Sequence, residues 1–349
     1  MTLNFLSIFI LISFSITLIV QKIFSRKNGI LLDSDFSKPQ AFHKEVVARS
    51  GGIASVISLI LFICIHYLIF SEILYEYIFI CLSLFFIGYL DDIKIKINPI
   101  TRLILMTSCL IIFISVLPIK IYNIDLIFLD LWLESNIFST LFILLCFLFI
   151  VNGANLIDGF NGLLAINLII INSILLSINM NNNNFEFSVF LISQIIILLS
   201  FLLFNFPKAK IFFGDSGSYL MGSLIALNTI FTNNLNPKIS SFFFCIILFY
   251  LFFEVFFSFF RKILYVGQNP LLPDRNHLHM LIYKFLTIKN KKKIDINYKV
   301  SIYINSVYIL LIIPSLIFIN SSLFSRYYFF CLLIIYVYFY KALNKKLNR

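Results

Sequence analysis

A run of small and polar residues interrupts two long apolar stretches near the middle of the chain. Residues 151–163 read VNGANLIDGFNGL, and polar members recur every three positions at Asn152, Asn155, Asp158 and Asn161. On a helical turn these side chains share one face. Polar groups at membrane depth are costly, so such a face is typical of a water-filled site. The alternative is a polar loop that caps two helices, because Asn and Asp start helices and Gly ends them.

Two adjacent carboxylates, Asp91 and Asp92, close an earlier apolar run. Such a pair can share a divalent cation, or one member can act as a general base. Acids at a helix C-terminus oppose the helix dipole, which favours a function over a solvated helix end paired with Lys94 and Lys96. Arg102 follows in the same polar stretch. It can face a phosphate, or it can be a topology charge that snorkels at the start of its helix.

A third polar island has Asp215 within the sequence Gly-Asp-Ser-Gly-Ser, where another apolar run begins. A metal-bound diphosphate needs this combination, a carboxylate for the cation and backbone N–H groups for the phosphates. An ordinary helix N-cap is the alternative. Lys210 adds positive charge nearby, and Phe212 can stack on a base or pack against its neighbours.

A fourth island, PDRNHLHM at residues 273–280, contains Arg275, His277 and His279. The histidines lack the i,i+4 spacing of a helical zinc site and no Cys accompanies them, so they indicate phosphate or sugar contact rather than metal ligation. A fifth island, AFHKEVVARSGGIA at residues 41–54, adds further basic groups.

The composition places these islands in a polytopic membrane protein. Of 349 residues, 60% are apolar and 12% charged, and the mean hydropathy is +0.99, whereas a soluble domain has about 25% charged residues. Apolar runs of membrane length predict an all-α bundle of about eleven transmembrane helices in a single domain, residues 1–349. The runs lie at about 3–24, 51–70, 73–90, 100–117, 137–151, 163–179, 186–206, 217–232, 239–260, 300–319 and 323–340. The segment 118–136 is expected to form a short hairpin or an interfacial helix.

The basic residues are divided unequally between the two sets of loops. Of 27 Lys and Arg, 24 lie on one side, and only Lys120, Lys238 and Arg326 lie on the other. Cytoplasmic loops carry such an excess, so we expect the N-terminus outside and the C-terminus inside. Every polar island then lies on the cytoplasmic face, as does the long loop 261–299. This topology accounts for the net charge of +11, and no nucleic-acid partner is expected.

The islands together supply acids for a divalent cation, basic groups for phosphates and an aromatic ring for a base at the cytoplasmic mouth of an apolar bundle. A charged, water-soluble substrate can meet a lipid there. The residues therefore predict metal-dependent phosphoryl chemistry on a membrane lipid. A lipid or ion transporter is the alternative from another class, but its acids would be strung across the membrane.

Four motifs, in this order, resemble those of the polyprenyl-phosphate N-acetylhexosamine-1-phosphate transferases, glycosyltransferase family 4. They are Asp91-Asp92, NLIDGFNGL at 155–163, KIFFGDSGS at 210–218 and PDRNHLHM at 273–280. The resemblance implies an α-helical bundle with a cytoplasmic site in the bacterial inner membrane. It also implies transfer of N-acetylhexosamine 1-phosphate from a UDP-sugar to undecaprenyl phosphate, with release of UMP, in the first membrane step of cell-envelope polysaccharide synthesis.

The resemblance further implies roles for individual residues. Magnesium, or manganese in its place, would be held by Asp215 with Asn155 as a second ligand, and Asp91 would deprotonate or position the lipid phosphate. The implied catalytic residues are Asp91, Asp92, His277 and His279. The implied substrate-binding residues are Asn152, Asp158, Asn161, Asn205, Phe212, Arg102, Arg275 and Lys210.

Two positions depart from the family pattern. Met280 follows His279 where relatives often continue with His, and Asn161 stands where many relatives have Asp. Both departures favour the undecaprenyl-phosphate GlcNAc-1-phosphate transferase branch, which starts O-antigen or teichoic-acid synthesis. The phospho-MurNAc-pentapeptide transferases of peptidoglycan synthesis are the alternative. A homodimer is a further expectation.

Overall fold

The chain forms an all-helical bundle with one small pair of strands. The computed structural model describes residues 2–25, 31–33, 45–95, 97–117, 119–267, 269, 274–289 and 296–347. The α-helices are α1 (Thr2–Phe24), α2 (Gly51–Phe70), α3 (Leu82–Asp92), α4 (Pro99–Val116), α5 (Ile127–Leu133), α6 (Asn136–Ile157), α7 (Leu163–Asn181), α8 (Phe185–Asn205), α9 (Gly214–Leu235), α10 (Ser241–Ile247), α11 (Phe249–Arg261), α12 (Leu278–Lys289), α13 (Asn297–Ile317) and α14 (Ser322–Leu347). Two π-helical segments are η1 (Tyr77–Cys81) and η2 (Lys262–Val266).

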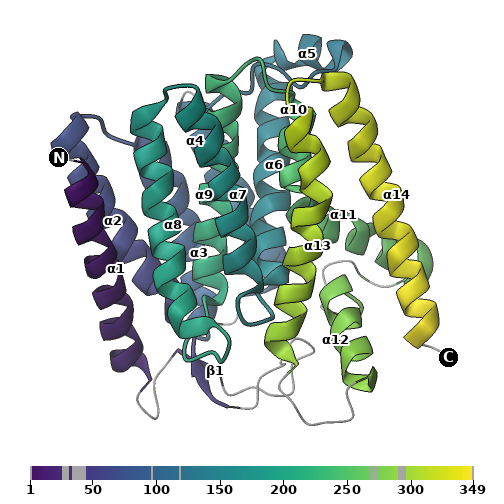
Figure 1. Ribbon diagram of the computed structural model, residues 1–349, viewed down its shortest axis with the longest axis horizontal. Helices are drawn as coiled ribbons and strands as arrows, with labels where there is room; N and C mark the ends of the chain where they lie inside the picture. Colours follow the sequence, from purple (N-terminus) through teal and green to yellow (C-terminus); the bar gives the residue numbers. More distant parts are fainter. Residues whose placement is uncertain are drawn as a thin grey trace.

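Most of the long helices run side by side between two ends of the molecule (Figure 1). The first turn of α9, the loop between α6 and α7, and α12 lie toward the lower end of Figure 1, and the last turn of α3 contacts the first turn of α9 there. This is the end predicted to be cytoplasmic. The other set of loops and the short helix α5 lie at the upper end. The helical alternative for the segment 118–136 is thus confirmed by α5. Residues 41–44 of the fifth island lie outside the described residues.

The expected all-α polytopic class is confirmed, but the count of eleven spans is not. In the described part of the chain, eight helices are long and apolar enough to cross a membrane, or nine if the bent pair α10–α11 is one span. The stretch expected at 73–90 is divided between η1 and the short helix α3. The stretch expected at 239–260 bends by 76° between α10 and α11. The stretch expected at 217–232 is α9, which has membrane length but too many polar residues.

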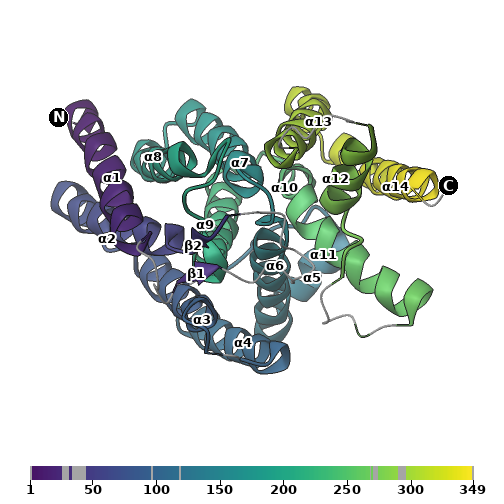
Figure 2. The ribbon, with the colours of Figure 1, turned by 90° about the horizontal axis from the view of Figure 1, so that it is seen from below.

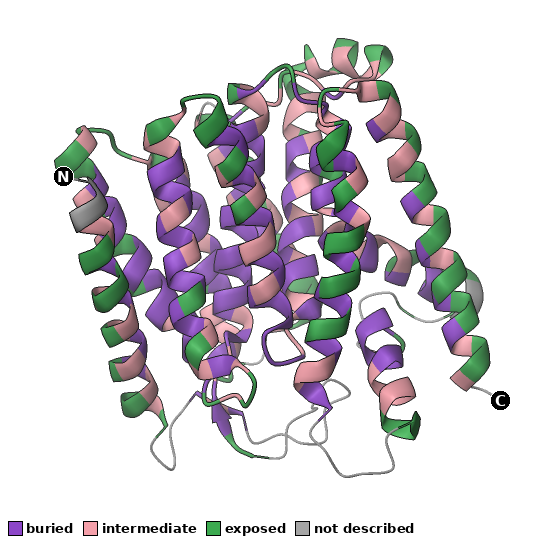
Figure 3. Cartoon of the chain, viewed as in Figure 1, coloured by how far each residue is buried: buried purple, intermediate pink, exposed green. Residues whose placement is uncertain are grey.

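Helix α9 lies inside the bundle, against α2, α3, α6 and α7 (Figure 2). Nearly all of its side chains are buried, whereas outer helices such as α14 alternate buried and exposed residues (Figure 3). Small residues allow this close packing. A Cβ at Gly88 of α3 would lie 2.4 Å from the backbone oxygen of Asp215, so only glycine fits there.

A network of buried amides joins α9 to its neighbours near mid-bundle. The side chain of Asn228 donates to Asn172 (3.0 Å) and Gln194 (2.7 Å), and its oxygen accepts from the Tyr77 hydroxyl (3.0 Å). Gln194 donates back to Asn228 (3.1 Å). Buried polar groups persist only when they are hydrogen bonded, so this network fixes the relative positions of η1, α7, α8 and α9.

The sequence did not reveal two short strands at the lower end. β1 (Leu32–Asp33) pairs antiparallel with β2 (Val47–Ala48). Ala48 also bridges to Ile211, and the backbone N–H of Gly51 donates to the carbonyl of Phe212 (2.8 Å). The chain before α2 is therefore tied to the segment before α9, beside the polar islands (Figure 2).

Candidate active site

The first turn of α9 is held by the carboxylate of Asp92 from the end of α3. One oxygen of Asp92 accepts from the backbone N–H of Asp215 (3.0 Å), and the other accepts from the N–H (2.9 Å) and hydroxyl (2.6 Å) of Ser216. Gly214 precedes them with φ +73°, and a Cβ there would lie 2.6 Å from the Asp92 carboxylate. These two N–H groups are already used by Asp92, so they are not free for phosphate as the sequence suggested.

Asp91 and Asp215 meet on one guanidinium nitrogen. Nη1 of Arg102, in the first turn of α4, contacts the carboxylate of Asp91 and lies 3.1 Å from that of Asp215. Asn98 caps α4 by accepting from the N–H of Ile100 (3.2 Å), which fixes the position of this turn. Arg102 thus lies between two carboxylates that come from helices α3 and α9.

Arg49, which follows β2, supplies a second positive charge. Its guanidinium pairs with Asp33 (2.8 Å) and lies 3.7 Å from Asp92. Burial disfavours the charge of Arg49, but the carboxylates of Asp215, Asp33 and Asp92 outweigh burial and raise its pKa above its ordinary value. The two arginines therefore offset part of the negative charge at this end of α9.

The end of α6 brings three predicted residues to the same region. Asn155 lies beside Tyr219 of α9. Burial, and then the charge of Asp215, raises the pKa of Asp158 well above its ordinary value. The side chain of Asn152 instead donates to the carbonyl of Leu148 in its own helix (2.7 Å). Asn155 and Asp158 thus belong with Asp215, whereas the amide hydrogens of Asn152 are directed to α6 itself.

Asn161 and Asn205 bind the surrounding loops together. The Asn161 side chain donates to the carbonyl of Pro207 (2.9 Å). Asn205 accepts from the N–H of Gly162 (2.6 Å) and donates to the carbonyl of Ile211 (2.8 Å). Both side chains are buried. Their predicted contacts with substrate stay predictions, and the contacts in the structure hold the α6–α7 and α8–α9 loops in register.

Phe212 and Lys210 lie on the strand-like segment before α9. The Phe212 backbone pairs with Ala48 and Gly51, and its side chain is partly exposed. Phe213 is buried and stacks on Phe201 with ring centroids 3.5 Å apart, so it belongs to the core. Lys210 is exposed. Phe212 and Lys210 remain accessible to a substrate.

The two histidines lie at the start of α12 and are both buried. His277 Nδ1 lies 3.2 Å from Glu254, and Nε2 lies 3.2 Å from Asp274. The His279 ring stacks on His277 at 5.5 Å and contacts the edge of Phe160 at 5.6 Å. Burial lowers the pKa of His279 to about 3. Phe160 connects this pair to the loop that follows Asp158.

Of two further residues near the histidines, the sequence predicted a role for one and not for the other. Arg275 was predicted to bind substrate, and it is exposed. Glu254 was missed, although it is buried in α11 and contacts His277. A single carboxylate within the apolar run FYLFFEVFFSFFR was the available signal, because ionisable residues inside membrane helices mark functional or paired positions.

The donor set suits a magnesium ion held partly by substrate. Among the described residues, no group of three or more His, Cys, Asp or Glu side chains is arranged around one metal position. Mg²⁺ is commonly bound by one or two carboxylates together with waters and substrate phosphates. Asp215 at the start of α9 is a carboxylate of this kind, and Asn155 lies against Tyr219 of the same helix, so these residues fit the ion.

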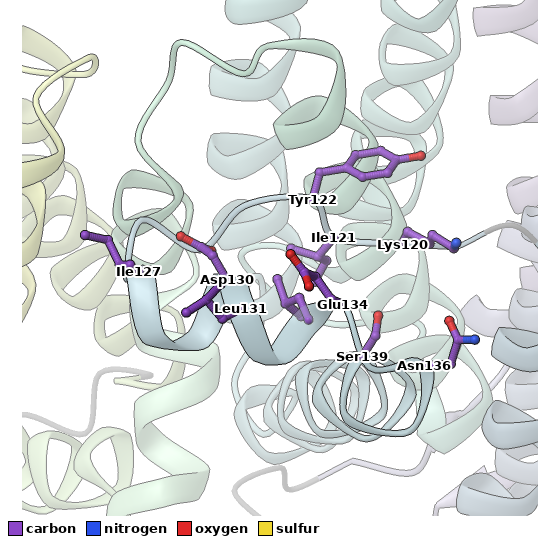
Figure 4. Close-up of a pocket in the computed structure, with 10 residues that line it drawn as sticks. Lys120, Ile121, Tyr122, Ile127, Asp130, Leu131, Glu134, Asn136 and Ser139 are labelled. Carbon is purple, nitrogen blue, oxygen red and sulfur yellow. The ribbon is translucent and has the colours of Figure 1, made fainter.

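A pocket of about 510 Å³ at the opposite end of the bundle is separate from this site (Figure 4). It lies between α5, the preceding loop and the start of α6, and Lys120, Asp130 and Glu134 line it. Asp130 accepts from the N–H of Ile124 (2.6 Å), which shapes the loop. The carboxylates of the candidate site lie at the other end, so this pocket is not part of it.

Comparison with known proteins agrees with the motifs. Residues 74–233 match the family described as Glycosyl transferase family 4. The match includes Asp91, Asp92 and Asp215 but ends before the histidines. An undecaprenyl-phosphate alpha-N-acetylglucosaminyl 1-phosphate transferase of Thermotoga maritima is 26% identical over 77% of this chain and 78% of the relative.

Two further relatives are phospho-N-acetylmuramoyl-pentapeptide-transferases. That of Wolbachia pipientis wMel is 31% identical over 58% of this chain and 66% of its own. That of Leuconostoc citreum is 44% identical over 23% of this chain and 25% of its own. Both kinds of relative carry transferase names, and the ordered motifs lie where the bundle brings acids and arginines together. The chain belongs to glycosyl transferase family 4.

Proposed function

We propose that the protein transfers N-acetylhexosamine 1-phosphate from a UDP-sugar to undecaprenyl phosphate and releases UMP, with magnesium or manganese as the metal. The observation that carries this proposal is the convergence of Asp91 and Asp215 on Arg102 at the start of α9. The relatives named above support the substrate class. The excess of basic residues on this side supports a site on the cytoplasmic face of the bacterial inner membrane.

In the proposed reaction, an oxygen of the lipid phosphate attacks the phosphorus that carries the sugar. The bond from that phosphorus to the bridging oxygen breaks, and UMP leaves with this oxygen. A bound metal would neutralise charge on the diphosphate. Asp91 would orient the lipid phosphate or accept its proton, and Asp215 with Asn155 would hold the metal. Arg102 would exchange its carboxylate contacts for phosphate oxygens, for which a guanidinium is well suited.

The decisive experiment is UMP release by purified protein with undecaprenyl phosphate and a panel of UDP-sugars. UDP-GlcNAc is expected to support turnover, chelation of divalent ions to stop it, and added Mg²⁺ to restore it. Turnover with UDP-MurNAc-pentapeptide alone would instead favour the second candidate, which the names of the Wolbachia and Leuconostoc relatives support. Silence with every UDP-sugar would refute the proposal and favour a transporter.

A further inference from the structure

A buried glutamate in the middle of an apolar helix organises the histidine segment. Glu254 of α11 is only 2% exposed. One of its oxygens accepts from the backbone N–H of Leu278 (3.0 Å) and faces His277 Nδ1 (3.2 Å). The other accepts from the hydroxyl of Tyr336 on α14. A carboxylate in an apolar bundle is costly unless its oxygens are satisfied, and here three donors converge on it.

His277 is held from both sides. Its Nδ1 faces Glu254, while Nε2 lies 3.2 Å from Asp274, whose second oxygen pairs with Arg261 (2.7 Å). Both ring nitrogens therefore have carboxylate partners. An imidazole with both nitrogens engaged has none to offer a substrate, so His277 is part of the framework.

His279 differs from its neighbour in one respect. It is fully buried, and its Nδ1 faces the hydroxyl of Tyr250 at 3.4 Å. Within the described residues, its Nε2 has no hydrogen-bond partner. Buried polar atoms are almost always hydrogen bonded, and an exception usually marks a functional position or a ligand site. When the Tyr250 hydroxyl donates to Nδ1, the ring proton resides on Nε2, which is then a donor.

We infer that Glu254 is a positioning residue that, with Asp274, fixes His277 so that the stacked His279 presents Nε2 to an oxygen of the nucleotide sugar. The stack of the two rings, 5.5 Å apart and nearly parallel at 5°, transmits the position of His277 to His279. Phe160, two residues after Asp158, contacts His279 and so connects this donor to the loop that carries Asp158. The assignment of the ligand rests on the proposed function.

A double-mutant cycle on kcat/KM for UMP release tests this assignment. Glu254→Gln keeps the side-chain shape but leaves one acceptor oxygen where three donors converge. We expect a loss of about tenfold or more, since misplacing a reacting group by about 1 Å can cost about a hundredfold. His279→Asn should cost roughly 10- to 100-fold, the value of a hydrogen bond to a charged group. In the His279→Asn background, Glu254→Gln should cost less than about twofold, because its effect passes through the missing ring.

Two further variants separate positioning from general damage. Tyr336→Phe removes only the hydroxyl donor to Glu254, so its loss should lie between wild type and Glu254→Gln. Glu186→Gln is the matched control, because Glu186 lies at the opposite end of the bundle, 3.4 Å from His66, and it should keep wild-type turnover. Equal losses from Glu254→Gln in both backgrounds would overturn the inference.

Hydrogen exchange measured by mass spectrometry supplies a readout that does not depend on turnover. Glu254→Gln should accelerate exchange in residues 274–289 and leave the first turn of α9 unchanged, because only the former is bonded to Glu254. Unchanged exchange in 274–289 would refute the anchoring role. If wild type releases no UMP, the proposed function fails, while the exchange result still decides whether Glu254 anchors the segment.

Discussion

The neighbouring acids Asp91 and Asp92 should respond very differently to loss of charge. Asp92 has a fully buried side chain with three hydrogen bonds to the first turn of α9, whereas the Asp91 side chain is 16% exposed and contacts Arg102. Asp92→Asn keeps one acceptor oxygen and turns an NH₂ group toward a backbone N–H. We therefore expect Asp92→Asn to destabilise the protein and Asp91→Asn to leave its stability nearly unchanged.

The size of the effect follows from these contacts. Leaving one buried N–H unpaired costs about 1–3 kcal/mol. The partly exposed contact with Arg49, at 3.7 Å, contributes less than about 1 kcal/mol. Asp92→Asn should therefore cost about 1–4 kcal/mol in stability, and a chain of this size should lose roughly 1.5–6 °C in apparent Tm. Asp91→Asn should stay within about 1 °C of wild type.

Thermal unfolding of the purified proteins in one detergent, at one scan rate, measures the difference. UMP release measured in parallel should fall in both variants. In Asp92→Asn the cause would be displacement of Asp215, and in Asp91→Asn it would be loss of the carboxylate that faces the lipid phosphate. If Asp92→Asn has the same apparent Tm as wild type while Asp91→Asn has a lower one, Asp92 does not anchor α9 and the reasoning is wrong.

The other predictions concern the metal position, the helix contact and the topology. Asp215→Asn should abolish UMP release without loss of folding, because an amide replaces a hard ligand; activity within a few-fold of wild type at unchanged magnesium dependence would contradict this role. Gly88→Ala should cost about 1–3 kcal/mol through overpacking against α9, whereas Gly159→Ala, with no atom within 4 Å of the new Cβ, should keep the wild-type Tm; equal melting of the two would refute the close contact. In a cysteine-free background, an impermeant thiol reagent should label Asn183→Cys in intact cells and not Lys345→Cys, and the reverse pattern would overturn the orientation.

The apolar runs were sufficient to predict the helical class, and the polar islands predicted which ends of the helices gather. Asp91, Asp158 and Asp215 are far apart in sequence, yet they meet because alternating spans return each island to the same end of the bundle (Figure 1). The topology alone predicts that these acids lie at the same end of the bundle. That prediction needs only the side of the membrane on which each loop lies, and not the rotation of each helix about its axis.

The rotation of each side chain could not be predicted. Adjacent residues on a helix point about 100° apart, so the dipeptide Asp91-Asp92 contains one acid for Arg102 and one for the backbone of α9, with nothing local to say which. Asn205 likewise could have faced a substrate, but its amide binds two loop backbones. Such partners come from distant segments, so tertiary contacts decide them.

The predicted count of eleven spans is not confirmed where polar residues are buried inside the bundle rather than exposed to lipid. Residues 217–232 read as an ordinary span, yet α9 is surrounded by protein and can carry Asn and Thr that lipid would exclude. Glu254 was overlooked because its partners, His277 and Tyr336, are distant in sequence.

The amide network around Asn228 has a consequence for how the chain enters the membrane. A segment as polar as α9 gains little by leaving the translocation channel for lipid on its own. The buried amide of Asn228 is bonded to Tyr77 of η1, Asn172 of α7 and Gln194 of α8, all of which are synthesised earlier. We therefore expect α9 to insert into the membrane efficiently only when these helices are already present. Glycosylation mapping would test this by comparing the insertion of α9 alone with that of α7–α9 together. The helix that carries Asp215 would then pack into the bundle only after η1, α7 and α8 have assembled. Chains in which these elements assemble incorrectly would therefore not form the candidate site.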